Sequence, residues 1–158
     1  MGIDGALSQT GFVIVDYTTA INVLKEGVIK TSSRDSHQKR LFSIYKSISK
    51  LMKDYKPSQV IIEKLYSHSK HPTTVWILGE VRGIILLCCA QNNVPVYEYS
   101  STHMRKSLVG KGNAKDYQLK RMASMILKRE VSSSHIVDAL ALVLAHIHTL
   151  RYKNVSKN

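Results

Sequence analysis

The sequence has 158 residues, with 23 lysines and arginines against 11 aspartates and glutamates. Its length suits one domain around one core, and only three prolines and eight glycines exclude a disordered or collagen-like polymer. The net charge of +12 favours a polyanionic partner, nucleic acid first, although a basic surface also serves solubility alone.

Two patterns predict a cytoplasmic protein. Cys88 and Cys89 are adjacent, which is a poor arrangement for a disulfide between them and indicates buried thiols in a reducing compartment. The chain opens without a charged-then-apolar leader, and its longest apolar runs, such as residues 84–90, are too short to cross a bilayer. We therefore expect no membrane partner.

The first half of the chain alternates strands with one helix. Apolar, β-rich runs predict three hairpin-linked strands at residues 1–4, 11–16 and 24–31. Apolar residues at helical spacing predict an amphipathic helix at 41–55. A short β-branched run that ends in an acid then predicts a central strand at 59–63, buried on both faces.

The second half is mainly helical. The stretch 73–92 is predicted as a helix that is apolar nearly all round, and such a helix must bury two faces. The later strands need right-handed helical crossovers and so run parallel. The sequence therefore predicts an α/β fold over residues 1–158, a mixed five-stranded sheet with helices on both faces. The remaining expected elements are a strand at 94–99, helices at 102–109, 115–130 and 134–152, and a frayed tail at 153–158.

The apolar helix at 73–92 carries more apolar surface than one face of a sheet can cover. We expect the surplus to form a two-fold interface, so that the protein is a homodimer. The candidate interface residues are Trp76, Ile77, Val81, Ile84, Ile85 and Cys88.

Three acids fall in apolar surroundings. Asp4 ends the first strand, Glu63 ends the central strand, and Asp138 lies in the last helix three residues after His135. If the two strands are neighbours, Asp4 and Glu63 meet at the sheet edge where α/β folds place ligands, and the last helix adds His135 and Asp138. Separate salt bridges or caps would also satisfy these acids. Carboxylates and an imidazole without thiolate suit Mg²⁺ or Mn²⁺ better than zinc.

Several motifs run in order along nearly the whole chain. They are Gly2-Ile3-Asp4 with Thr10-Gly11-Phe12, Ile61-Ile62-Glu63, Gly79-Glu80-Val81-Arg82-Gly83, residues 94–99, Val109-Gly110-Lys111-Gly112 and residues 135–140. Together they resemble the RuvC family of Holliday junction resolvases, bacterial or phage-borne. The resemblance implies a ribonuclease-H-like fold, a homodimer, and divalent-metal hydrolysis of two strands of a four-way junction to 5′-phosphate and 3′-hydroxyl ends.

By position, the resemblance implies a catalytic and metal-binding quartet of Asp4, Glu63, His135 and Asp138, holding a pair of Mg²⁺ or Mn²⁺ ions. Many members have an aspartate where this chain has His135, so one negative charge is missing here. The imidazole would complete the metal shell or accept a proton from the attacking water. In the competing interpretation His135 is a helix-start residue without catalytic duty.

DNA contacts are also implied. Tyr66 occupies the place of an aromatic that stacks on a base near the junction centre, with packing under its own loop as the alternative. Of two basic positions near the scissile phosphates, one is Arg105 and the other is Asp116 in this chain. Further phosphate contacts, or else solvated surface charges, are expected at His68, Lys70, Lys111, Lys115, Lys120 and Arg121.

The turn after Asp4 is Gly5-Ala6 where the family usually has Pro-Gly, and the short first strand predicts an α-amino group near the metal site. Two other functions would use the same residues: another ribonuclease-H-like nuclease, of RNase H or transposase type, and a non-catalytic junction-binding protein. A branch-migration complex is a candidate further partner. A phage origin would place the protein in the host cytoplasm.

Overall fold

The computed structural model describes residues 1–18, 20–65 and 72–155. Within them, five strands form one mixed sheet in the order β3-β2-β1-β4-β5. The pairs β1–β2 and β2–β3 are antiparallel, whereas β1–β4 and β4–β5 are parallel. The strands are β1 Gly2–Asp4, β2 Gln9–Tyr17, β3 Ile21–Lys30, β4 Val60–Glu63 and β5 Val96–Tyr99.

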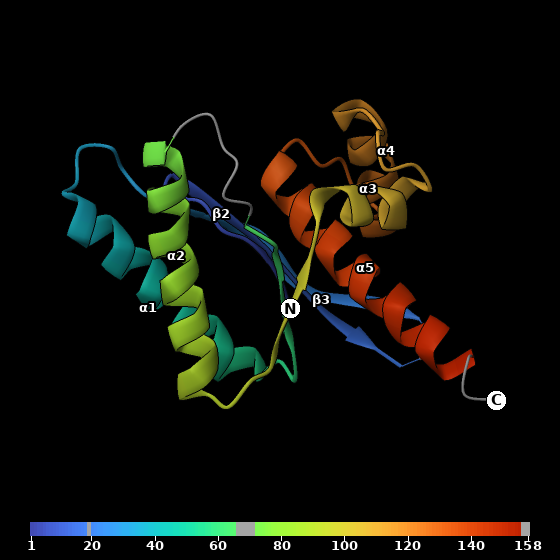
Figure 1. The fold of residues 1–158 in the computed structure, drawn as a ribbon, viewed down its shortest axis with the longest axis horizontal. Coiled ribbons are helices and arrows are strands. Elements are labelled where there is room, and N and C mark those ends of the chain that lie inside the picture. The colour runs from blue at the N-terminus through green and yellow to red at the C-terminus, as the bar shows by residue number, and fades with distance from the viewer. Residues whose placement is uncertain (19, 66–71, 156–158) are drawn as a thin grey trace.

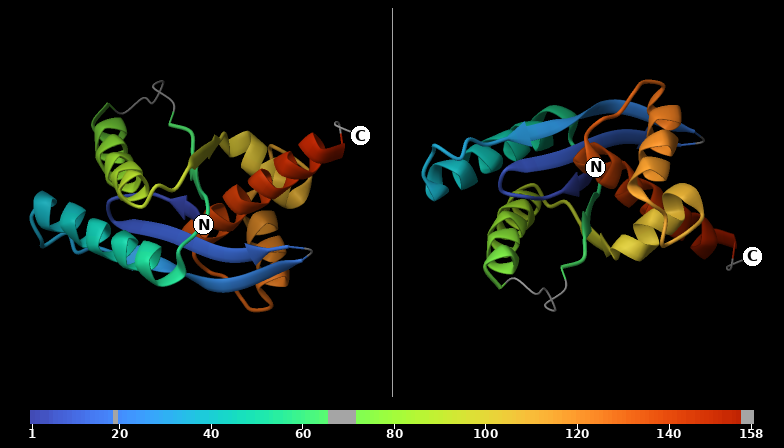
Figure 2. Two further views of the ribbon diagram at one scale, coloured as in Figure 1. Left: turned by 90° about the horizontal axis from the view of Figure 1, so that it is seen from below. Right: turned by 90° about the horizontal axis from the view of Figure 1, so that it is seen from above.

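Helices cover both faces of this sheet. Figure 1 shows α1 and α2 on one side of the strands and α3, α4 and α5 on the other, and Figure 2 shows the same division from below and above. Each face has its own apolar core. The expected mixed α/β architecture is therefore confirmed. The helices are α1 His37–Tyr55, α2 Pro72–Gln91, α3 Ser101–Val109, α4 Asp116–Leu127 and α5 Ser134–Val155.

Two helices extend beyond their predicted bounds for local reasons. Helix α1 begins before its first apolar residue because the Ser36 side chain accepts a hydrogen bond from the Lys39 amide and caps the helix. Helix α5 continues to Val155, so residues 153–155 are helical where we expected fraying. Its last turns are tied to β2, since Arg151 Nε donates to the Tyr17 hydroxyl at 2.6 Å.

Helix α2 packs one face on the sheet and exposes much of the rest. Val81, Ile85 and Cys88 are 0%, 2% and 0% exposed within the core that α1, α2 and the sheet share. Their assignment to a dimer interface is therefore wrong, because they have no surface left to offer a partner. Trp76 is 70% exposed. Ile77 and Ile84 are partly buried against the same core and, with Trp76, remain predicted interface residues.

The same helix has a second property that the short apolar runs did not indicate. Thr73–Gln91 is long and apolar enough to cross a membrane by length and composition, with a mean hydropathy of 1.6, and 22% of it is buried within the chain. The core helix of a soluble protein passes the same test. What decides its role here is that its buried side chains complete the core on this face of the sheet.

Candidate active site

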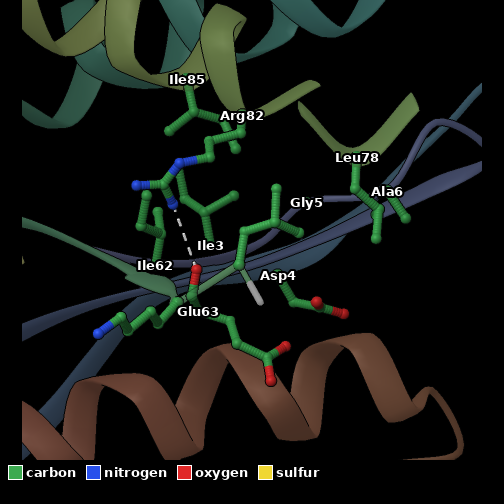
Figure 3. A pocket seen from close by; sticks show the side chains of 11 residues that line it. Ile3, Asp4, Gly5, Ala6, Ile62, Glu63, Leu78, Arg82 and Ile85 are labelled. Atoms are coloured by element: carbon green, nitrogen blue, oxygen red, sulfur yellow. Dashed lines mark hydrogen bonds between the residues drawn. The ribbon is translucent and has the colours of Figure 1, made fainter. Parts of the chain in front are cut away.

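Strand pairing brings Asp4 and Glu63 to one edge of the sheet. In the parallel pair of β1 and β4, Ile3 lies opposite Ile62, so the next residues in this register are Asp4 and Glu63. Side chains alternate along a strand. Ile3 and Ile62 enter the core beneath α1 and α2, and both acids therefore face α5. Figure 3 shows the two carboxylates on the α5 side of the strands.

Helix α5 lies directly on β1 and β2 because one glycine in each strand leaves room for the helix backbone. A Cβ atom on Gly2 would lie 2.1 Å from the Ala139 carbonyl oxygen, and one on Gly11 would lie 2.2 Å from the His135 carbonyl oxygen. Both contacts are too close for any side chain. Gly2 on β1 and Gly11 on β2 thus set the distance between these strands and the helix that carries His135 and Asp138.

The start of α5 completes the cluster. His135 Nδ1 lies 2.5 Å from Asp4 Oδ2, and both side chains are partly buried, 30% and 18% exposed. This contact confirms that the helix places His135 beside the end of β1. The imidazole hydrogen-bonds directly to the carboxylate, so His135 contacts the site, and its catalytic role stays a prediction.

Burial raises the pKa of all three carboxyls, and neighbouring acids raise two of them further. Burial, followed by the negative charges of Asp4 and Glu63, raises the pKa of Asp138 to about 6. Burial also raises the pKa of Glu63, with an added contribution from Asp4 and an opposing hydrogen bond with Ser101. Burial likewise raises the pKa of Asp4 against the hydrogen bond from His135. These acids therefore share one crowded electrostatic site that a cation would relieve.

Oxygen and imidazole donors of this kind fit a hard divalent ion such as Mg²⁺ or Mn²⁺. The raised pKa values of these acids fit it as well, because burial, and for Glu63 and Asp138 the charge of Asp4, disfavours the ionised form that a cation would stabilise. Among the described residues, no three His, Cys, Asp or Glu side chains converge as a ready-made metal cluster. The donor chemistry thus fits a cation, while the side chains as they stand do not enclose one.

The predicted DNA-contacting residues divide into four groups. Arg105 is already engaged, since its Nη2 lies 3.0 Å from Asp116 Oδ1 and its Nη1 donates to the Ala114 carbonyl at 2.7 Å. Lys120 lines a cavity of about 180 Å³ together with Arg105, Asp116 and Asp138. The exposed residues of the set are Lys111, Lys115 and Arg121, while Tyr66, His68 and Lys70 lie outside the described residues.

One expectation about the site is wrong. The Met1 α-amino group donates to the Gln59 carbonyl oxygen at 2.8 Å, at the opposite end of β1 from Asp4. An extended strand carries its first residue away from its last, by about 3.3 Å per residue. Burial lowers the pKa of this amino group to about 6.

Sequence reasoning also missed two residues, Arg82 and Asp116, as parts of the site. Arg82 donates to the Glu63 carbonyl oxygen. Asp116 pairs with Arg105, and its negative charge adds to the raised pKa of Asp138. A signal existed for each, because Arg82 stands in one of the motifs and Asp116 replaces an expected cation.

Comparison with known proteins identifies the family. The model of the family "Crossover junction endodeoxyribonuclease RuvC" matches residues 1–146. This chain belongs to the RuvC family. Relatives from Petrotoga mobilis and Chlamydia caviae, both named crossover junction endodeoxyribonuclease RuvC, are 34% and 35% identical to it. These matches cover 92% and 96% of this chain and 91% and 94% of the relatives.

Solved RuvC structures agree with the fold. "T. thermophilus RuvC in complex with Holliday junction substrate" has a TM-score of 0.87 and 26% identity to this chain, covering 96% of this chain and 94% of that one. A second solved structure, "Thermus thermophilus RuvC structure", has a TM-score of 0.80. The resemblance inferred from the motifs is thus confirmed, together with the ribonuclease-H-like fold. RuvC membership implies a divalent-metal-dependent nuclease.

Proposed function

We propose that this chain resolves Holliday junctions: it is a crossover junction endodeoxyribonuclease that cuts four-way DNA by paired, symmetric nicks, leaving 5′-phosphate and 3′-hydroxyl ends. The observation that carries the proposal is the cluster of three acids under α5 in a member of the RuvC family: burial raises the pKa of each, and the charge of Asp4 raises those of Glu63 and Asp138 further. The net charge of +12 supports a DNA substrate. Other branched junctions are further candidate substrates.

The four side chains take distinct roles in this mechanism. Asp4, which lies between Glu63 and His135, would hold a pair of Mg²⁺ or Mn²⁺ ions together with Glu63 and Asp138. When bound, these ions supply a water of lowered pKa and neutralise the leaving 3′ oxygen. His135, hydrogen-bonded to Asp4 at 2.5 Å, either completes the ligand set or accepts the proton of the attacking water.

Paired nicks need a pair of active sites, and a homodimer supplies them. Exposed apolar side chains on α2 support a two-fold contact through this helix, with Trp76 as its most exposed aromatic. We place the protein in the cytoplasm, or in the host cytoplasm for a phage product. Sedimentation at micromolar concentration tests the dimer, and a stable monomer would contradict it.

The decisive experiment is nicking of a synthetic mobile four-way junction with Mg²⁺, with Mn²⁺ and with EDTA. We expect symmetric nicks with either metal and none in EDTA. A linear duplex and an RNA–DNA hybrid serve as control substrates. Preferred cutting of the hybrid would assign an RNase H activity instead, and metal-independent junction binding without any nicking would assign a binding protein.

A further inference from the structure

Arg82 on α2 contacts the backbone of Glu63 from the opposite face of the sheet. Its Nη1 donates to the Glu63 carbonyl oxygen at 3.3 Å, and its Nη2 donates to Glu98 Oε1 on β5 at 2.5 Å. Figure 3 shows the guanidinium extending from α2 to this carbonyl, while the Glu63 carboxylate points away toward α5. One side chain thus ties α2 to the ends of β4 and β5.

The surroundings of Arg82 favour a fixed position. Its side chain is 22% exposed and lines a cavity of about 260 Å³ together with Asp4 and Glu63. Charge-assisted hydrogen bonds in such partly enclosed sites are short and strong. The positive charge is already matched by the Glu98 carboxylate, so Arg82 is held within the protein and does not project toward a phosphate.

Glu63 is the last residue of β4, where a strand has few ladder bonds to hold it. Immediately after it, the Lys64 amide donates to the Tyr99 carbonyl oxygen at 2.9 Å, and the Arg82 contact to the Glu63 carbonyl reinforces this end. The carboxylate that the proposed function needs is attached to this same residue. Any twist of the strand end therefore moves the acid relative to Asp4.

We propose that Arg82 is the positioning residue of Glu63: with Glu98 as its counterion, it fixes the end of β4 and so holds the Glu63 carboxylate at the distance from Asp4 that cleavage requires. This role rests on the proposed function. It also explains why the motif at residues 79–83 contains an arginine, since this arginine belongs neither to the cluster of acids nor to the predicted DNA contacts.

A direct phosphate contact by Arg82 is the competing role, and Glu98 separates the two. If Arg82 bound phosphate, Glu98→Gln would release the guanidinium and tighten junction binding. If Arg82 positions Glu63, Glu98→Gln loosens the strand end, lowers the nicking rate and leaves junction affinity unchanged. The two roles therefore predict different effects of one substitution on junction affinity.

The test measures single-turnover nicking, junction Kd and Tm for wild type and for four variants. Misplacement of a catalytic group by about 1 Å costs roughly a hundredfold in rate, so we expect Arg82→Gln to lower the nicking rate about 10- to 100-fold. Glu98→Gln should lower it less, and so should Arg82→Lys, whose ammonium reaches one of the two partners. Junction Kd should stay within about twofold of wild type, because no phosphate contact is lost.

Arg129→Gln is the matched control. Like Arg82, Arg129 joins a carboxylate, that of Glu26, and a backbone carbonyl, that of Glu130, but it contacts none of the site residues. We expect this variant to nick at the wild-type rate even if its Tm falls. An equal loss of rate in Arg129→Gln would show a general effect of lost stability and overturn the proposal.

Amide hydrogen exchange at Lys64 gives a readout that needs no activity. Arg82→Gln and Glu98→Gln should both speed this exchange, while Arg129→Gln should not. A wild-type nicking rate with unchanged exchange in Arg82→Gln, or tighter junction binding in Glu98→Gln, would overturn the positioning role. If wild type itself nicks no junction, the proposed function fails, and the exchange rates still decide whether Arg82 fixes the end of β4.

Discussion

Replacing Asp138 by asparagine should stabilise the metal-free protein while it abolishes cleavage. Burial, and then the charges of Asp4 and Glu63, raise the pKa of Asp138 from 3.8 to about 6. At 1.36 kcal/mol per pKa unit, ionising this carboxyl costs about 3 kcal/mol more in the folded chain than in the unfolded chain. Solvent screening of the half-buried group reduces this difference to about 2 kcal/mol. Asparagine has nearly the same shape and carries no charge.

The pH dependence follows from proton linkage. A carboxyl whose pKa is higher in the folded state takes up a proton on folding, so its contribution to stability is complete below the unfolded pKa of 3.8 and is lost as the pH rises through about 6. Without metal, Asp138→Asn and wild type should therefore differ little near pH 4. At pH 8 the variant should unfold about 4–8 °C higher, since 1 kcal/mol shifts Tm by about 2–4 °C at this size.

Thermal unfolding in EDTA, followed by circular dichroism from pH 4 to 8, measures this difference. Asp54→Asn is the matched control, because Asp54 forms an exposed ion pair with Lys50 on α1 at 2.8 Å, outside the acid cluster. The control should not gain stability at pH 8. Added Mg²⁺ should raise the Tm of wild type more than that of Asp138→Asn. A variant that unfolds at or below the wild-type temperature in EDTA at pH 8 would refute the electrostatic reasoning.

Three further outcomes are expected. Asp4→Asn and Glu63→Gln should each slow junction nicking by more than about a hundredfold without weakening binding, as measured by single-turnover assay and fluorescence anisotropy. His135→Asp should retain activity and move the acidic limb of the pH–rate profile to lower pH, while His135→Ala with a wild-type rate and profile would remove this residue from the site. Asp116→Asn should free Arg105 to contact a phosphate and so tighten junction binding in EDTA. The slope of the logarithm of the binding constant against the logarithm of the salt concentration should steepen by about one, and an unchanged slope would contradict this.

Much of the site was predictable because strand periodicity and charge burial constrain it strongly. Adjacent parallel strands align their carboxyl ends, so the sequence alone predicts that acids at the ends of two β-rich runs meet at one edge of the sheet. The spacing of His135 and Asp138 predicts that they share a helix face. In the structure His135 hydrogen-bonds to Asp4, and the charge of Asp4 raises the pKa of Asp138, so both side chains lie near Asp4.

The faces of α2 were harder to predict because its sequence is apolar almost all round. Without an amphipathic stripe, nothing in the pattern says which residues turn toward the sheet. Val81 and Cys88 were assigned to a partner and instead complete this chain's own core, whereas Trp76 is exposed. The crossing of α2 over the strands and its contact with α1 decide this, and both are tertiary properties.

The partners of long cationic side chains were the least predictable part of the site. Arg82 and Arg105 each have several bonds of freedom, so their positions in the sequence do not determine which acid or carbonyl they reach. In the folded chain Glu98 holds the first against the Glu63 backbone, and Asp116 holds the second beside the acid cluster. Both guanidiniums are thus paired with acids of the chain itself. We infer that Arg105 can contact a scissile phosphate only when DNA displaces Asp116 from it. Loss of the Asp116 carboxylate should therefore alter the salt dependence of DNA binding.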